Sequence, residues 1–123
     1  VEMRVEEPPA GLVVKADKGQ LQQALLNLIL NALAAMLDGG FLALSVERLE
    51  GGKAAIRVQD SGGGIPEEFR ERIFDSFLTG YNEGVGLGLA ISKRILKGHE
   101  GDLELLETGP DGTTFRLTLP LAE

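Results

Sequence analysis

The chain has 123 residues, of which 43% are hydrophobic and 25% are charged, and this composition is typical of one globular domain with an aliphatic core. It contains no cysteine and one histidine, which excludes disulfides, thiolate chemistry, cysteine-ligated zinc and a histidine-rich metal site. The net charge of −7 argues against a general nucleic-acid or anionic-membrane surface, because both need an excess of lysine and arginine. We therefore expect a single domain over residues 1–123 that contacts neither nucleic acid nor a membrane directly.

The first half of the chain predicts a long helix followed by a β-hairpin. A short strand is expected at 12–15, and Asp17 then has the position of an N-cap, with Gln20 as its reciprocal capping-box partner. The helix should run to about Leu37, where two glycines end it. Alternating patterns at 41–49 and 53–59 predict two strands joined by a hairpin turn over 50–52.

The second half predicts a short helix, a longer helix and two more strands. Pro66 can open a helix over 67–74 after a glycine loop, and residues 76–83 are expected to be irregular. A helix at 87–96 should end in the basic and glycine residues that follow it. Strands at 102–107 and 113–119 flank a turn at 109–112. This order of elements favours an α/β two-layer sandwich with a mixed, largely antiparallel sheet and helices packed on one face.

Two asparagines are the main polar feature of the long helix. Asn27 and Asn31 are four residues apart and therefore lie on one helix face, amid leucines. Backbone carbonyls could satisfy such amides, as they do in ordinary buried sites. The functional alternative is that a carboxamide oxygen ligates a magnesium ion that also bridges phosphate oxygens, since magnesium prefers oxygen ligands.

Two glycine-rich segments are candidates for contact with a nucleotide. In the segment 60–66, the carboxylate of Asp60 can accept a hydrogen bond from an exocyclic amine, and the glycines admit a flat purine against the backbone. In the segment 84–89, glycines lead into a helix whose free N–H groups can face phosphate. Each segment alone would equally suit a solvated turn or a helix cap.

Four motifs in this order resemble the N, G1, F and G2 boxes of sensor histidine kinase catalytic domains. They are Asn27-Leu28-Ile29-Leu30-Asn31-Ala32, Asp60-Ser61-Gly62-Gly63-Gly64-Ile65-Pro66, Phe74-Asp75-Ser76-Phe77 and Gly84-Val85-Gly86-Leu87-Gly88-Leu89. The resemblance covers nearly the whole chain. The stretch 78–83 is similar to the short ATP lid of the nitrogen-regulation type of sensor kinase.

The resemblance implies a Bergerat-type fold that binds ATP and Mg²⁺. Asn31 would ligate the magnesium ion, Asn27 would help to hold the phosphates or the ion's waters, and Asp60 would bind the adenine amine. The resemblance assigns no certain catalytic side chain. The remaining nucleotide contacts that it implies are Gly62, Gly64, Ile65, Phe77, Thr79, Gly84, Gly86, Leu87, Gly88, Leu89 and Thr114.

The activity implied by the resemblance is that of a cytoplasmic, ATP-dependent protein histidine kinase. The phosphoryl acceptor would be a histidine on separate dimerisation helices of the same protein, which are expected to lie outside residues 1–123, and a response regulator would act downstream. The full-length protein could then be soluble or attached to a membrane. His99 is expected to be a structural cap or turn residue and not the acceptor.

The chain departs from the family pattern at two places. Ala34 stands where such kinases often have lysine or glutamine, and Tyr81 stands where a lysine often follows two threonines. A missing lysine removes a charge that could stabilise the transferring phosphoryl group, which keeps open a degenerate nucleotide-binding module without transfer activity. An anti-sigma-factor-type serine kinase is the other alternative, although such kinases tend to have a glutamate where this chain has Asn27.

Overall fold

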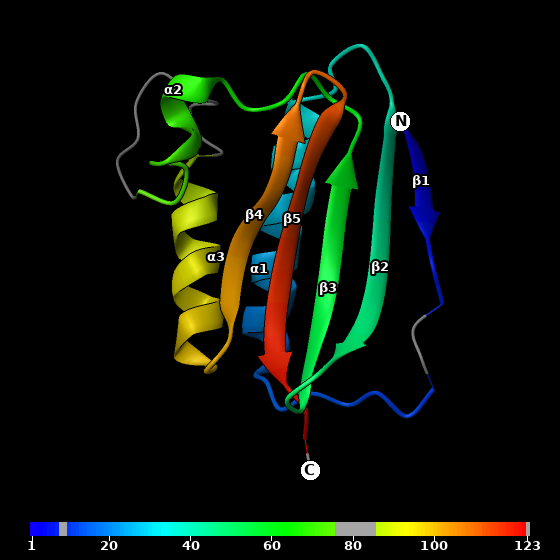
Figure 1. Ribbon diagram of the computed structural model, residues 1–123, viewed down its shortest axis with the longest axis vertical. Helices are drawn as coiled ribbons and strands as arrows, with labels where there is room; N and C mark the ends of the chain where they lie inside the picture. Colours follow the sequence, from blue (N-terminus) through cyan, green and yellow to red (C-terminus); the bar gives the residue numbers. More distant parts are fainter. Residues whose placement is uncertain (8–9, 76–85, 123) are drawn as a thin grey trace.

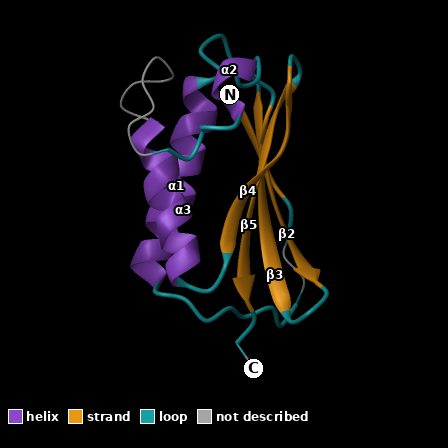
Figure 2. Cartoon of the chain, turned by 60° about the vertical axis from the view of Figure 1, so that its left-hand side comes forward, coloured by secondary structure: helices purple, strands orange, loops and turns teal. Residues whose placement is uncertain are grey.

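A five-stranded sheet with helices against one of its faces forms the architecture of the computed structural model, which describes residues 1–7, 10–75 and 86–122 (Figures 1 and 2). The elements in chain order are β1 (Glu2–Val5), α1 (Lys18–Ala34), β2 (Phe41–Leu49), β3 (Lys53–Asp60), α2 (Glu67–Arg70), α3 (Gly86–Gly98), β4 (Asp102–Gly109) and β5 (Gly112–Pro120).

The strand order in the sheet is β1-β2-β3-β5-β4. The pairing of β1 with β2 is parallel, and the other three pairings are antiparallel, so the predicted mixed, largely antiparallel sheet is confirmed. Helices α1 and α3 lie side by side on the same face of the sheet, as Figure 2 shows. This arrangement confirms the predicted α/β two-layer sandwich.

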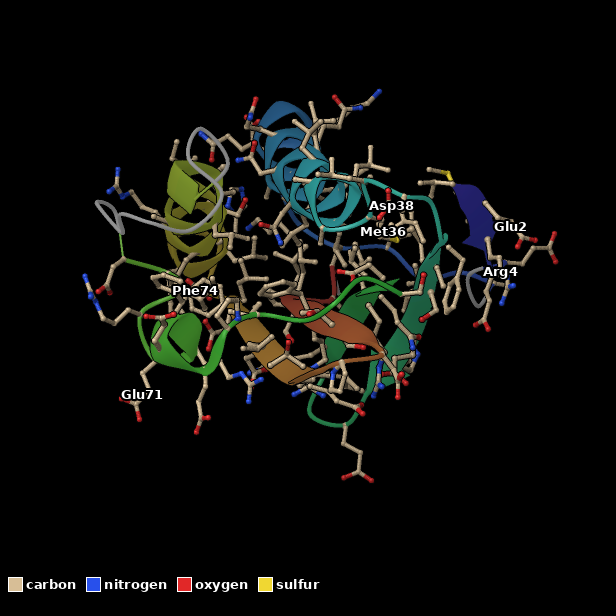
Figure 3. All side chains as sticks on the ribbon, turned by 90° about the horizontal axis from the view of Figure 1, so that it is seen from above. Glu2, Arg4, Met36, Asp38, Glu71 and Phe74 are labelled. Carbon is tan, nitrogen blue, oxygen red and sulfur yellow. The ribbon has the colours of Figure 1, made fainter. Side chains whose placement is uncertain are left out.

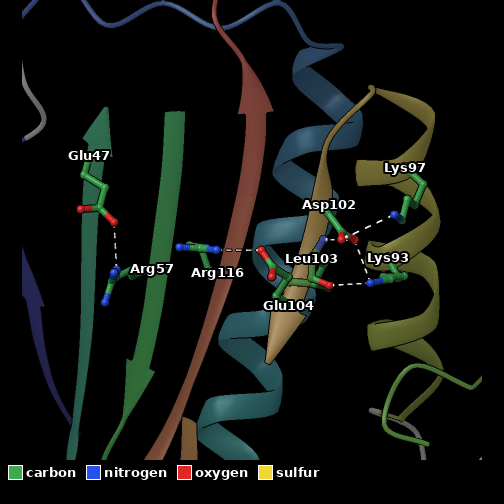
Figure 4. A network of polar contacts seen from close by, with 8 residues as sticks. All are labelled: Glu47, Arg57, Lys93, Lys97, Asp102, Leu103, Glu104 and Arg116. Atoms are coloured by element: carbon green, nitrogen blue, oxygen red, sulfur yellow. Dashed lines mark hydrogen bonds and ion pairs between the residues drawn. The ribbon is translucent and has the colours of Figure 1, made fainter. Parts of the chain in front are cut away.

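The core lies between this helix pair and the sheet. Leu28 of α1 and Leu89 of α3 are buried there against strand residues such as Leu42, Val58 and Leu117. The opposite face of the sheet is polar. Figure 4 shows the ion pairs of that face and its edge, including Arg57 with Glu47 and Arg116 with Glu104.

Only one of the two hydrogen bonds of the predicted capping box forms at the start of α1. The Asp17 side chain accepts the backbone N–H of Gln20 at 2.8 Å, which confirms Asp17 as the N-cap. The backbone N–H of Asp17 donates to Nε2 of His99 at 3.0 Å instead of to the Gln20 side chain. The other ring nitrogen of His99 lies 2.8 Å from the carbonyl oxygen of Ile95, so this histidine joins the end of α3 to the start of α1.

Several predicted boundaries differ from those observed. The expected strand at 12–15 is reduced to an isolated bridge between Val14 and Leu121, whereas the strand β1 had no clear alternating signal. Helix α1 ends at Ala34 and not near Leu37, and α2 covers only the first half of the predicted 67–74 helix. The predicted irregular stretch 76–83 lies outside the described residues. No helix in the described part of the chain combines the length and apolarity needed to cross a membrane.

Candidate functional site

One face of α1 brings most of the described candidate residues together. Asn27, Asn31 and Ala35 follow one another at four-residue spacing along this face. At one end Asn27 contacts Gly88 in the first turns of α3. At the other end a Cβ added to Gly62 would lie 2.7 Å from the carbonyl oxygen of Ala35. Asn31 is therefore placed between the two glycine-rich segments that the sequence singled out.

Both the oxygen and the nitrogen of the Asn27 carboxamide bond to protein groups. Its oxygen accepts a hydrogen bond from Nε2 of Gln23 at 2.9 Å, and its nitrogen donates to the carbonyl oxygen of Gly88 at 3.2 Å. Gly88 lies so close to α1 that an added Cβ would be 3.3 Å from the Asn27 side chain. Asn27 therefore fixes the beginning of α3 against α1.

The carboxamide oxygen of Asn31, in contrast to that of Asn27, has no hydrogen-bond partner among the described residues. The Asn31 side chain is only 2% exposed, so this oxygen, Oδ1, is buried. A buried carbonyl oxygen without a partner costs about 1–3 kcal/mol, so such an atom calls for an explanation. Its chemistry suits a hard cation, which would take the oxygen as one of its ligands.

Asp60 ends β3 with its side chain buried at 3% exposure. One carboxylate oxygen accepts the backbone N–H of Gly62 at 2.8 Å. Burial raises the pKa of Asp60, although hydrogen bonds from the backbone of Gly62 and Thr113 act in the opposite direction. The site therefore contains one buried acceptor group held in place from two sides.

The glycines after Asp60 are required by packing. Gly64 has a φ of +85°, and a Cβ there would collide with the backbone of Gly109 in the β4–β5 turn. A Cβ at Gly62 would crowd Ala35 and the carboxylate of Asp60. The two glycines thus allow the loop to lie flat between the end of α1 and the β4–β5 turn.

Thr113 is a site residue that the sequence reasoning missed. It is 4% exposed, it faces Asp60 across the β3–β5 pairing, and its hydroxyl lies 2.9 Å from that of Thr108. The Thr108 hydroxyl in turn accepts the backbone N–H of Ile65 at 2.8 Å. The alternation of side chains along the strand could have identified it, because Thr113 lies two residues before the buried Phe115 and therefore on the same face of the sheet.

Thr114, which the resemblance implied as a nucleotide contact, is not brought to this site. It pairs with Gln59 and lines a hollow on the polar face of the sheet, together with residues such as Arg57. Ile65 and Leu89 are buried core residues at the site, and Gly86 and Leu87 begin α3. Phe77, Thr79, Gly84 and the lid predicted at 78–83 lie outside the described residues.

The basic side chains nearest to the F-box motif are used in structural contacts. Nζ of Lys93 lies 2.7 Å from an Asp102 carboxylate oxygen and from the carbonyl oxygen of Leu103 (Figure 4). It also lies 4.8 Å from the ring centroid of Phe74. Seen from above in Figure 3, Phe74 lies below α3 next to the strands, and its ring contacts Phe115 edge to face. Arg72 pairs with Asp75 at 3.4 Å.

Comparison with known proteins gives consistent matches over nearly the whole chain. The family model described as histidine kinase-, DNA gyrase B- and HSP90-like ATPase matches residues 16–123. The C4-dicarboxylate transport sensor protein DctB of Rhizobium meliloti (strain 1021) is 42% identical over 122 residues, which cover 98% of this chain and 19% of DctB. The signal transduction histidine-protein kinase AtoS of Escherichia coli (strain K12) is 37% identical over 108 residues, covering 88% of this chain and 18% of AtoS.

Solved structures agree with these sequence matches. The nucleotide-free catalytic domain of histidine kinase ThkA superposes with a TM-score of 0.85 at 32% identity, covering 97% of this chain and 78% of that one. Full-length ShkA in complex with AMPPNP gives a TM-score of 0.82 at 31% identity, covering 98% of this chain and 25% of ShkA. The chain therefore spans less than a fifth of DctB and of AtoS, but most of the ThkA catalytic domain.

Proposed function

Because the chain belongs to the histidine kinase-, DNA gyrase B- and HSP90-like ATPase family, we propose that residues 1–123 are the ATP-binding catalytic domain of a two-component sensor histidine kinase. The domain donates the γ-phosphoryl group of ATP to a histidine on a separate dimerisation domain of the same protein, from which it passes to a response regulator. Its place is the cytoplasm. The names of DctB, AtoS and ThkA support this assignment, and the nitrogen-regulation subtype stays a prediction.

The observation that carries the proposal is that Oδ1 of Asn31 has no hydrogen-bond partner among residues 1–7, 10–75 and 86–122. This oxygen is buried between the two glycine-rich segments, where a nucleotide bound along the α1 face would have its phosphates. A Mg²⁺ ion there would take Asn31 as a protein ligand and complete its shell with phosphate oxygens and water. The described residues offer no cluster of three acidic or histidine side chains as an alternative metal site.

The adenine end of the proposed site is Asp60. An adenine amine would donate to the carboxylate of Asp60, which also accepts backbone hydrogen bonds from Gly62 and Thr113. The flat loop at Gly62 and Gly64 would form one wall of the pocket. Thr113 would hold the acceptor group in position through the backbone hydrogen bond that Asp60 receives from it.

The phosphate end is the start of α3. The first backbone N–H groups of a helix have no partner within the helix and attract anions. Asn27 fixes this helix start by its bond to the carbonyl oxygen of Gly88. In this proposal Asn27 acts on the phosphates through the position of α3, and the amides of Gly86, Leu87, Gly88 and Leu89 make the contacts.

Phosphoryl transfer is favoured over hydrolysis by the chemistry of position 27. An ATPase needs a general base near the attacking water, and the carboxamide of Asn27 is not basic enough to take a proton. Lys93 is committed to Asp102, Leu103 and Phe74, and so does not replace the lysine that the lid lacks. We therefore expect slow transfer that depends on groups from the acceptor domain.

The direct test has two parts. Titration calorimetry on the 123-residue chain should show ATP binding that weakens when magnesium is removed. The full-length protein incubated with radiolabelled ATP should give an acid-labile, base-stable phosphoprotein, as expected of a phosphohistidine. ATP binding without any labelled histidine would instead support the degenerate binding module, and an acid-stable label on a separate protein would support the serine kinase.

A further inference from the structure

Three side-chain hydrogen bonds join α1 and its N-cap to α3 and the turn that follows it. One lies at each end of the helix pair and one near its middle. They link Asn27 with Gly88, Ala24 with Ser92, and Asp17 with His99, at 3.2, 3.1 and 3.0 Å. Residue numbers rise along α1 as they fall along α3, so the two helices are antiparallel, as Figure 1 shows. Of the side chains that make these bonds, only the imidazole changes its charge near neutral pH.

The two contacts of His99 fix its protonation state. A backbone N–H can only donate, so Nε2, which accepts the N–H of Asp17, carries no proton. A carbonyl oxygen can only accept, so Nδ1, which lies 2.8 Å from the carbonyl oxygen of Ile95, carries the one proton of the ring. We call the bond between Asp17 and His99 the histidine clamp. A second proton, on Nε2, would set two N–H groups against each other and abolish the clamp.

The turn after α3 holds the imidazole in place. The backbone N–H of Gly101 donates to the carbonyl oxygen of Leu96 at 2.8 Å, and Glu100 has a φ of +61°, in the left-handed region that non-glycine residues rarely adopt. Such a conformation persists where the surrounding contacts determine it. Because the ring is also bonded to Ile95 within α3, a repulsion at Nε2 acts on the start of α1 and not on α3.

The histidine clamp borders an open hollow of about 500 Å³, which His99 itself lines, so protons from solvent reach the ring. The charged groups that line this hollow or flank it in the chain are three acidic and three basic side chains. They are Lys15 and Asp17 before α1, Lys18 in its first turn, Lys97 in the last turn of α3, Glu100 after it and Asp102 at the start of β4. The end of β5 contributes only Pro120 there. Since neither sign prevails, the bond to the Asp17 N–H decides which form of the ring the closed clamp accepts.

We propose that the histidine clamp is a proton-sensitive device that controls how firmly α3 is held to α1. The neutral ring of His99 ties the start of α1 to the end of α3, and protonation of Nε2 opens this tie and weakens ATP binding. The second effect rests on the proposed function, in which α1 and α3 hold the magnesium and phosphate ends of the nucleotide. Histidine ordinarily changes its charge between about pH 5 and 8, so the device responds to mild acid.

The remaining two bonds explain why an open clamp affects the ATP site without unfolding the domain. The bond from Ser92 to Ala24 is buried and contains no group that titrates near neutral pH, so the helices stay together when the clamp opens. They can then shift about this middle contact, which changes the position of Asn31 relative to the first amides of α3. One hydrogen bond of ordinary strength changes an equilibrium by about two- to tenfold, and this range bounds the expected loss of affinity.

The protonation state can be observed directly, because His99 is the only histidine of the 123 residues. Heteronuclear NMR of the imidazole ring, recorded on the chain without a histidine tag, therefore reports on the clamp alone. The neutral ring should be in the Nδ1–H form at about pH 8. A ring in the Nε2–H form at that pH would overturn the proposal, because it could not accept the N–H of Asp17.

Amide hydrogen exchange tests whether the proton opens the clamp. The N–H of Asp17 is the reporter, and the N–H of Gln20 is a matched control in the same cap, since it donates to the Asp17 carboxylate. After correction for the direct effect of pH on exchange, protection of Asp17 should fall about fivefold between about pH 8 and pH 5.5, and that of Gln20 by less than about twofold. An equal change at both amides would overturn the proposal.

Two variants connect the clamp to ATP. In His99→Gln a carboxamide oxygen can accept the Asp17 N–H and does not titrate, whereas His99→Leu removes the clamp at every pH. Acid also protonates ATP itself and Asp60, but it does so in all three proteins, so the comparison uses affinity ratios from calorimetry. From about pH 8 to pH 5.5 the wild type should lose about fivefold in affinity relative to His99→Gln. His99→Leu should bind about fivefold more weakly than His99→Gln at both pH values.

A ratio of wild type to His99→Gln that does not change with pH would overturn the proposal, even if the Asp17 amide loses protection. Absence of ATP binding by all three proteins at both pH values would contradict the proposed function. The exchange experiment needs no nucleotide, so it would still decide whether a proton opens the clamp.

Discussion

The side-chain amide of Asn27 donates to the backbone carbonyl of Gly88 across 3.2 Å, and this hydrogen bond joins α1 to the first turns of α3. Four residues further along α1, Asn31 presents a buried carbonyl oxygen that has no partner within the described structure. The two asparagines that look equivalent in the sequence therefore differ in their surroundings: one joins two helices, and the other has a buried oxygen without a partner among the described residues.

Leucine substitutions should separate these roles. Asn27→Leu removes the hydrogen bonds that Asn27 makes with the carbonyl of Gly88 and the amide of Gln23, and we expect the free energy of unfolding to fall by about 1–3 kcal/mol. Asn31→Leu removes a polar atom that has no partner in the described part of the chain, so stability should be unchanged or higher, while the magnesium dependence of ATP binding is lost. Urea denaturation and calorimetry measure the two quantities. Equal destabilisation by both substitutions would contradict this division.

Asp60→Asn should weaken ATP binding without weakening the fold. The variant exchanges one acceptor oxygen for an N–H donor that opposes the adenine amine, and a loss of about tenfold or more in affinity is expected, equivalent to about 1.4 kcal/mol. Calorimetry at pH 7 measures this loss. An unchanged affinity would remove Asp60 from the proposed site.

The same substitution has a pH-dependent effect on stability whose sign follows from the raised pKa of Asp60. A carboxyl with a raised folded-state pKa stabilises the fold below its unfolded pKa, and this contribution is lost as the pH rises through the folded pKa. Once it is ionised, the buried carboxylate therefore costs stability. Asp60→Asn should melt at the same or a higher temperature than the wild type at pH 7, and any advantage should shrink as the pH falls toward the range in which Asp60 is protonated.

Gly64→Ala tests the packing of the loop against the β4–β5 turn. The substitution combines a positive φ with a collision against the backbone of Gly109, and we expect it to destabilise the protein by about 2–3 kcal/mol. Gly63→Ala is the control one residue away, because a Cβ there meets nothing within 4 Å. Thermal melts of the two variants should differ clearly, and a Gly64→Ala protein as stable as Gly63→Ala would show that the turn moves aside easily.

Lys93→Met should cost more stability than Lys97→Met. Lys93 bonds to the carbonyl of Leu103 and to Asp102 and contacts the ring of Phe74, and its loss is expected to cost about 1–2 kcal/mol. Lys97 is more exposed and lies 3.5 Å from the same carboxylate, so its substitution should cost less than about 0.5 kcal/mol. Chemical denaturation at pH 7 compares the two variants.

Acid should reduce the difference between Lys93→Met and the wild type. Burial acts to raise the pKa of Asp102, but the hydrogen bonds from Lys93 and Leu103 and the charges of Lys93 and Lys97 outweigh it, and the net pKa is lowered. A lowered folded-state pKa gives stability that is present above the unfolded pKa and lost as the pH falls through the folded pKa. A gap between the two proteins that stays constant from pH 7 to the acid range would show that Asp102 contributes nothing to it.

The elements and the two-layer arrangement could be predicted because their signals are local. Asp17 caps the helix that follows it, and the strand pairs flank turns rich in glycine. The partner of the Asp17 backbone N–H could not be found in this way, because His99 is 82 residues away and meets it only once α1 and α3 have packed together. The single parallel pairing of β1 is non-local for the same reason.

The candidate site was predictable as a set of motifs but not as a set of contacts. Asn27 and Asn31 share a spacing and a residue type, so only their neighbours Gln23 and Gly88 distinguish them. Which of Thr113 and Thr114 lies at the site depends on which face of β5 each side chain occupies. Thr113 faces the helices with the buried Phe115, and the motif itself does not show which of the two threonines does so.

The parallel pairing of β1 with β2 also has a consequence for the order of folding and for mechanical load. The β2–β3 and β4–β5 hairpins close over short turns, whereas β1 can pair only after α1 has carried the chain back across the sheet. All four residues of β1 are exposed, so this strand should form last and open first. A pulling force applied at Val1 would therefore break the hydrogen bonds between β1 and β2 before it strained the two hairpins. The edge of the sheet would open first, and the rest of the fold would stay intact.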